Sequence, residues 1–148
     1  MASCLVFNTR NNYKIITESY TDVGLLITDE PVFILKKPVS NQVLWLAIYD
    51  CLKSSRLKIK QPKRDEWGTW QKNMLKLLQE TSFDKLYKTS SSCQVKLEND
   101  ELFLFQYKYK PKIGLLANQI ANHTFVFNEN HYDEYINSLN NLLSITIE

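Results

Sequence analysis

Short apolar runs, separated by polar residues and without a helical period, make up the first 37 residues. Runs of this length and composition are typical of β-strands. The breaks between them contain Asn, Asp, Thr and Glu, which are common in turns. We therefore predict up to four strands, which cover Cys4 to Phe7, Tyr13 to Ile16, Val23 to Ile27 and Val32 to Leu35.

Three later segments place apolar residues at helical spacing. The first begins near Ser40, a favourable N-cap, and ends near Lys53. The second follows Asp65 as a candidate cap and continues to about residue 80, and the third covers about residues 130 to 143, with Asn128 or Asn130 as its cap. The apolar faces are Leu44, Ala47, Ile48 and Cys51 in the first helix, Trp67, Trp70, Met74, Leu77 and Leu78 in the second, and Tyr132, Tyr135, Ile136, Leu139, Leu142 and Leu143 in the third.

Residues 85 to 110 change to a period of two. Polar residues separate Cys93, Val95 and Leu97, and the pair Asn99-Asp100 then forms a two-residue turn. We predict a β-hairpin whose second strand continues to residue 110, and one more short strand at 125 to 127. The fold class is therefore α+β, a single domain with a mostly antiparallel sheet flanked by about three helices.

Composition agrees with one ordinary globular domain. The chain has 148 residues, of which 44% are hydrophobic and 23% are charged. Only three glycines occur, which leaves little material for the glycine-rich loops of nucleotide-binding folds. No apolar run approaches the length of a membrane span, and the N-terminus lacks the pattern of a signal peptide. A cytoplasmic protein is the expectation.

The cysteines do not indicate a disulfide framework or a zinc site. Cys4, Cys51 and Cys93 are odd in number, far apart and without a CxxC motif. We predict three reduced thiols, no metal ligands and no cofactor.

Charge is unevenly distributed along the chain. Lys and Arg number 18 and Asp and Glu 16, which gives a net charge of only +2. After Lys112 there is no Lys or Arg, whereas Glu129, Asp133 and Glu134 follow. The chain thus has an acidic final part and a basic middle, whose six cations are Lys53, Arg56, Lys58, Lys60, Lys63 and Arg64.

Two functions remain as alternatives to a protein-binding role. The basic 53–64 segment, with the alternating Tyr and Lys residues at 107–110, has the cations and aromatic faces that bind single-stranded nucleic acid, although a solvated connection has the same composition. The two histidines, His123 and His131, would allow a small nuclease, but no neighbouring acid in the sequence is placed to orient either ring.

Two segments carry a family resemblance. The first reads Phe-Ile-Leu-Lys-Lys-Pro-Val-Ser at 33–40 and is followed by a predicted helix that closes with Leu-Lys-Ser-Ser-Arg at 52–56. The second extends from Met-Leu-Lys-Leu-Leu at 74–78 to Phe-Asp-Lys-Leu-Tyr-Lys at 83–88. Both are similar to the immunity proteins of contact-dependent growth inhibition systems, the CdiI family. One departure is Leu44-Trp45-Leu46, where the family pattern has a Leu-Gly pair.

The resemblance implies a cytoplasmic inhibitor that is not an enzyme. Residues 1–148 would form one immunity-protein-like domain, in a heterodimer with the C-terminal toxin domain of a cognate CdiA-type effector. Toxins of this family are often nucleases. Exposed acids suit a basic nuclease, and tyrosines suit the core of an interface. The predicted toxin-binding residues are Glu98, Asp100, Glu101, Tyr107, Tyr109, Glu129, Asp133 and Glu134.

Overall fold

Residues 1–144 are the part of the chain that this computed structural model describes, and their strands form one antiparallel sheet. The sheet order is β3-β2-β1-β4-β5-β6, and β7 pairs with the first half of β5, so β6 and β7 share one edge. The strands are β1 Ala2–Asn8, β2 Asn12–Tyr20, β3 Leu26–Lys36, β4 Ser91–Glu98, β5 Glu101–Lys110, β6 Gly114–Ala117 and β7 His123–Val126. The helices are α1 Asn41–Ser54, α2 Trp67–Leu78, α3 Phe83–Lys88 and α4 Tyr132–Leu143, with a 3₁₀ turn, η1, at Glu129–His131.

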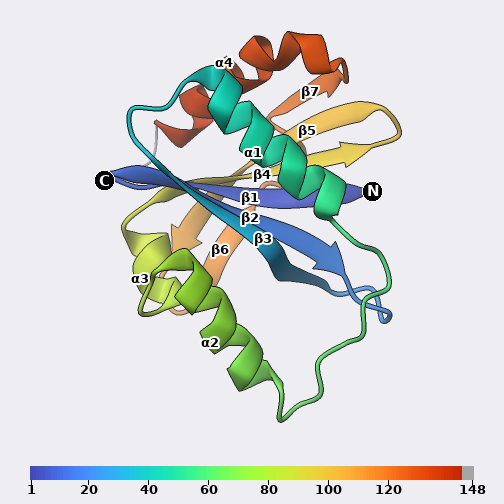
Figure 1. Ribbon diagram of the computed structural model, residues 1–148, viewed down its shortest axis with the longest axis vertical. Helices are drawn as coiled ribbons and strands as arrows, with labels where there is room; N and C mark the ends of the chain where they lie inside the picture. Colours follow the sequence, from blue (N-terminus) through green and yellow to red (C-terminus); the bar gives the residue numbers. More distant parts are fainter. Residues whose placement is uncertain (145–148) are drawn as a thin grey trace.

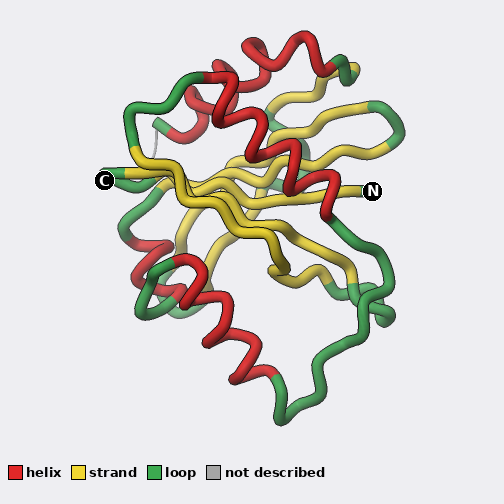
Figure 2. The backbone as a smooth tube through the Cα atoms, in the orientation of Figure 1, coloured by secondary structure: helices red, strands yellow, loops and turns green. Residues whose placement is uncertain are grey.

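Helices cover both faces of the sheet, α1 and α4 on one side and α2 and α3 on the other (Figures 1 and 2). Strand β1 shows how the sequence permits this. Cys4 and Val6 join the core under α1 and α4, whereas Leu5 and Phe7 join the core under α2 and α3. Successive side chains point to opposite faces of a strand, so a continuous apolar run is buried on both sides. The predicted α+β class with one sheet is confirmed.

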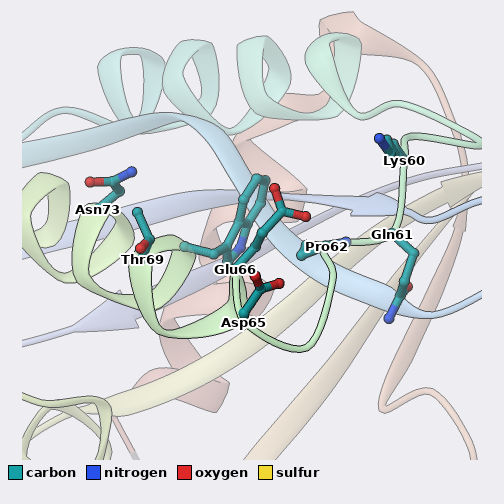
Figure 3. Close-up of a pocket in the computed structure, with 8 residues that line it drawn as sticks. Lys60, Gln61, Pro62, Asp65, Glu66, Thr69 and Asn73 are labelled. Atoms are coloured by element: carbon teal, nitrogen blue, oxygen red, sulfur yellow. The ribbon is translucent and has the colours of Figure 1, made fainter.

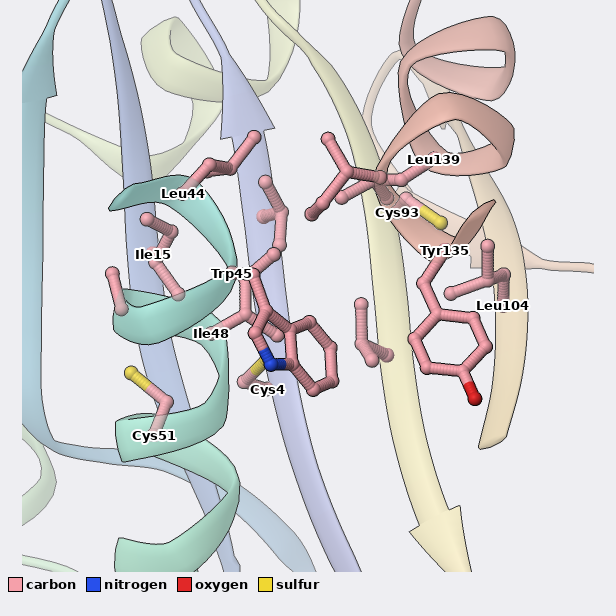
Figure 4. Close-up of a cluster of buried hydrophobic side chains, with 14 of the residues drawn as sticks. Cys4, Ile15, Leu44, Trp45, Ile48, Cys51, Cys93, Leu104, Tyr135 and Leu139 are labelled. Carbon is pink, nitrogen blue, oxygen red and sulfur yellow. The ribbon is translucent and has the colours of Figure 1, made fainter. Parts of the chain in front are cut away.

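The larger core lies between α1, α4 and the sheet (Figure 4). Trp45 is 3% exposed, and its ring centroid lies 5.5 Å from that of Tyr49 and 5.6 Å from that of Tyr135. The tryptophan that departs from the family pattern is therefore a central packing residue. Cys51 is fully buried in the same core, as predicted for an ordinary core residue.

Three strands occupy the first 37 residues, where up to four were predicted, because the last two predicted ranges fall in or just before one strand. Val23 lies in the turn before β3, and the apolar residues around Ile27 and Val32 belong to the same edge strand. The polar break between them contains Asp29, which turns inward and accepts hydrogen bonds from Arg56 at 3.0 Å. Because β3 has a neighbour on only one side, a register shift opposite Ile16 can absorb the break.

The hairpin was predicted to begin at Lys85, but Phe83–Lys88 form helix α3 and the first hairpin strand begins at Ser91. Ser82 caps this helix by accepting a hydrogen bond from the Lys85 backbone N–H at 3.1 Å, and Leu86 is fully buried. Six residues give fewer than two turns, so no helical period develops in the sequence. Strand β6 was also not predicted, because its four residues do not alternate between apolar and polar.

The predicted helix caps are partly confirmed. Ser40 caps α1 by accepting a hydrogen bond from the Val43 N–H at 3.2 Å. The N-cap of α2 is Glu66 rather than Asp65, and it makes no side-chain capping bond. Asn128 caps the 3₁₀ turn before α4 instead of α4 itself. No helix within residues 1–144 is both long and apolar enough to span a membrane.

A candidate protein-docking surface

The β4–β5 hairpin presents three carboxylates at its tip. Asn99 and Asp100 have φ angles of 52° and 61°, the left-handed conformation that a tight two-residue hairpin turn requires. Glu98 and Glu101 face each other as the last pair of the ladder. Asp100 and Glu101 are exposed and Glu98 is half-buried, so the predicted hairpin tip is an acidic projection.

The start of α4 is attached to this tip. The Phe127 backbone N–H donates a hydrogen bond of 2.8 Å to the carbonyl oxygen of Asp100, and Val126 pairs with Glu101. The corner that follows is held by Tyr135, whose hydroxyl accepts from the Asn128 N–H at 2.8 Å. Glu129, two residues beyond Phe127, thus begins the second acidic group next to the first.

Six of the eight predicted site residues therefore lie at two connected places, the hairpin tip and the start of α4, and we call this set of residues the acidic surface. Within residues 1–144 none of its carboxylates takes part in an ion pair. Asp133 and Glu134 lie in the first turn of α4, where the helix dipole favours negative charge. Asp133 also accepts a hydrogen bond from the Asn41 side chain at 3.1 Å. The acidic surface consists of Glu98, Asp100, Glu101, Glu129, Asp133 and Glu134.

The two tyrosines lie elsewhere, at the other end of β5. Tyr107 is six residues from Glu101, about 20 Å along an extended strand. Its ring packs on the core under α2 and α3, and burial raises the pKa of its hydroxyl. Tyr109 donates a hydrogen bond of 2.6 Å to Asp84 of α3, which raises the pKa of Tyr109 and lowers that of Asp84. These two residues are separate from the acidic surface.

The two histidines lie at the beginning of β7 and beyond its end. His123 begins β7, whereas His131 follows the end of this strand by five residues, so an extended segment separates them. The His123 ring stacks on Phe125 with centroids 6.0 Å apart. Neither imidazole makes a hydrogen bond within the described residues, so no carboxylate orients either ring.

The three cysteine side chains pack in the core under α1 and α4. Cys4, Cys51 and Cys93 are free and buried. Burial raises the pKa of Cys51 to about 11 and that of Cys93 to about 12, so both remain protonated near neutral pH. Nowhere in residues 1–144 do three or more histidine, cysteine or acidic side chains form a group that could hold a metal ion.

The basic 53–64 segment is an exposed connection beside the β3 edge of the sheet. Its Arg56 is tied to buried Asp29, and its backbone pairs with the end of β2 through the Ile59 N–H and the Tyr20 carbonyl, 3.0 Å apart. Lys53 pairs with Asp50 at 3.4 Å. The other four cations make no ion pair in the described part of the chain. The connection and the acidic surface therefore flank opposite edges of the sheet.

Two recesses line α2. One of about 390 Å³ lies between α2 and the basic connection, with Lys60, Pro62 and Asn73 on its walls (Figure 3). The second, of about 620 Å³, shares Trp70 and Asn73 with the first and extends to Gln79. The residues that line them include no histidine or cysteine, so they add none of the nucleophiles or bases considered above.

Comparison with solved structures identifies proteins that share this fold. No family model and no curated protein matches the chain. Similar solved structures include a protein of unknown function from Neisseria meningitidis, with a TM-score of 0.68 and 17% identity over 96% of this chain and 92% of that one. Another is a chain of the CdiA-CT/CdiI toxin and immunity complex from Yersinia pseudotuberculosis, with a TM-score of 0.68 and 13% identity over 97% and 95% of the two chains.

Proposed function

We propose that this protein is an immunity protein that binds and neutralises the toxin domain of a contact-dependent growth inhibition effector in the cytoplasm. The observation that carries the proposal is the fold, shared over nearly the full length of both chains with a chain of a toxin and immunity complex. The short CdiI-like segments around β3, α1 and α3 agree with it. Such a protein acts by binding and needs no catalytic residues.

The acidic surface is the proposed contact with the toxin. A nuclease must attract a polyanion, so the region around its active site is expected to be cationic. Six carboxylates without cationic partners in the described residues present the complementary potential. Such complementarity speeds the encounter of two proteins and selects against partners of the wrong charge.

The test is protection of cells from a toxin. The C-terminal domain of the effector encoded immediately upstream is expressed with and without this protein. We expect growth arrest by the toxin alone, normal growth when both are made, and co-purification as a 1:1 complex. Continued arrest, together with failure of the two purified proteins to associate, would contradict the proposal.

A further inference from the structure

Strand β5 turns two phenylalanines toward the sheet face that carries α2 and α3. Leu102 and Leu104 are buried in the core under α1 and α4, so their neighbours Phe103 and Phe105 point to the opposite face. The two rings stack with centroids 6.4 Å apart. Both remain partly exposed.

The helices on that face do not pack on these two rings. The core under α2 and α3 includes Leu86 of α3 and reaches Tyr107 of β5, but neither Phe103 nor Phe105 belongs to it. Figure 1 shows the reason, since α3 lies next to β6, at the end of β5 far from the β4–β5 turn. The first half of β5 thus has a helix layer on one face only.

Exposed residues of β7 and half-buried Lys96 of β4 extend this area. Thr124 of β7 and Lys96 of β4 stand on either side of Phe103 in the sheet. Val126 stands opposite Glu101 and is 81% exposed, which is high for a valine. We call this area the open strip, and its residues are Lys96, Glu101, Phe103, Phe105, Thr124 and Val126.

We propose that the open strip is the apolar part of the docking surface, and that it receives an aliphatic or aromatic side chain which the toxin domain presents among lysines and arginines. The inference rests on the proposed function and names the contact that retains the bound partner. Glu101 belongs to both the strip and the acidic surface, so the two are continuous. Lys96 is the one cation in the strip, against the three acids of the hairpin tip. Interfaces of this kind place apolar anchors centrally and charges at the rim.

The test compares two exposed valines in the complex of the full chain with the toxin domain. Val126→Ser removes apolar surface from the strip, whereas Val23→Ser makes the same change at a valine that is 72% exposed beside the other edge. We expect Val126→Ser to dissociate about tenfold faster and Val23→Ser to behave as wild type, because lost apolar contact acts mainly on the dissociation rate. Phe103→Ala should dissociate at least about thirtyfold faster, the effect of an interface hot spot.

The dissociation rates distinguish failure of this inference from failure of the proposed function. Val126 contacts solvent over most of its surface, so Val126→Ser should unfold at the wild-type temperature and the test does not depend on whether Phe103→Ala folds. If the complex forms and both valine variants dissociate at the wild-type rate, this inference is overturned and the proposed function stands. If the wild-type protein forms no complex with the toxin domain, both are overturned.

Discussion

Glu18 is a buried carboxylate in the middle of the sheet. It is 6% exposed, and one of its oxygens accepts hydrogen bonds from the Ser3 hydroxyl at 2.7 Å and from the Gln94 amide at 3.0 Å. Burial raises its pKa, and the hydrogen bonds and nearby Lys96 oppose this shift without cancelling it. The ionised form is therefore less favourable in the folded protein than in the unfolded chain.

This residue predicts a pH dependence of stability. At pH values below the pKa of Glu18 in the unfolded chain, Glu18 is protonated in both states and does not lower the free energy of unfolding. As the pH rises above that value, Glu18 ionises first in the unfolded chain. The free energy of unfolding therefore falls until the pH passes the pKa of Glu18 in the folded protein. Glu18→Gln keeps an acceptor but cannot ionise. We expect urea unfolding to show that the variant gains stability relative to wild type between pH 4 and pH 7. The account would be contradicted if the free energy of unfolding changed with pH equally in Glu18→Gln and wild type. It would also be contradicted if Glu98→Gln, at the half-buried hairpin position, gave an equal gain in stability.

At the scale of elements, the long periodic segments were predictable and the short ones were not. The helices α1, α2 and α4 and the β4–β5 turn follow from periods and turn chemistry that extend over many residues. Helix α3 depends on burial of Leu86 and on its cap, which a six-residue window does not reveal. The acidic residues were predictable singly, but the proximity of the two acidic groups depends on pairing of β7 with β5, in which Glu101 stands opposite Val126, 25 residues later in the sequence. The open strip was missed because exposure of Phe103 depends on where α2 and α3 end.

Helix α3 should depend measurably on its N-cap. Ser82 satisfies the Lys85 N–H, and loss of such a cap costs about 1 kcal/mol. We expect Ser82→Ala to lower the free energy of unfolding by about that amount in chemical denaturation. Thr81→Ala, an exposed neighbour without a described side-chain hydrogen bond, should change it by less than about 0.5 kcal/mol. Equal effects of the two substitutions would show that the cap does not stabilise α3.

At the scale of the whole molecule, the acidic surface and the basic connection lie at opposite edges of the sheet. The acidic surface lies at the β5–β7 side, and the basic connection lies beside β3. Net charge is close to zero, so the two patches rather than the total charge determine how a charged partner approaches. Exposed Lys58, Lys60 and Lys63 offer a competing surface of opposite sign along one short segment. Charge reversal can therefore decide which patch meets the toxin.

Reversal of the α4 acids should slow association with the toxin. The triple change of Glu129, Asp133 and Glu134 to Lys replaces attraction by repulsion, and we expect stopped-flow mixing at low salt to show association at least about tenfold slower, with the difference shrinking as salt is added. Stability should fall modestly, by about 0.3–1 kcal/mol for each first-turn acid whose dipole interaction is lost. The matched control makes the same charge change at three exposed acids away from the surface, Glu30, Asp50 and Asp65.

The control separates position from total charge. If both triple variants slow association equally, net charge rather than the acidic surface sets the rate. If neither does, and reversal of Lys58, Lys60 and Lys63 abolishes protection instead, the basic connection is the working face and the toxin must dock through an acidic surface. A slow rate confined to the α4 variant, with a wild-type rate for the control, would show that the toxin approaches along the β5–β7 side of the sheet, where the carboxylates attract it and the open strip can then retain it.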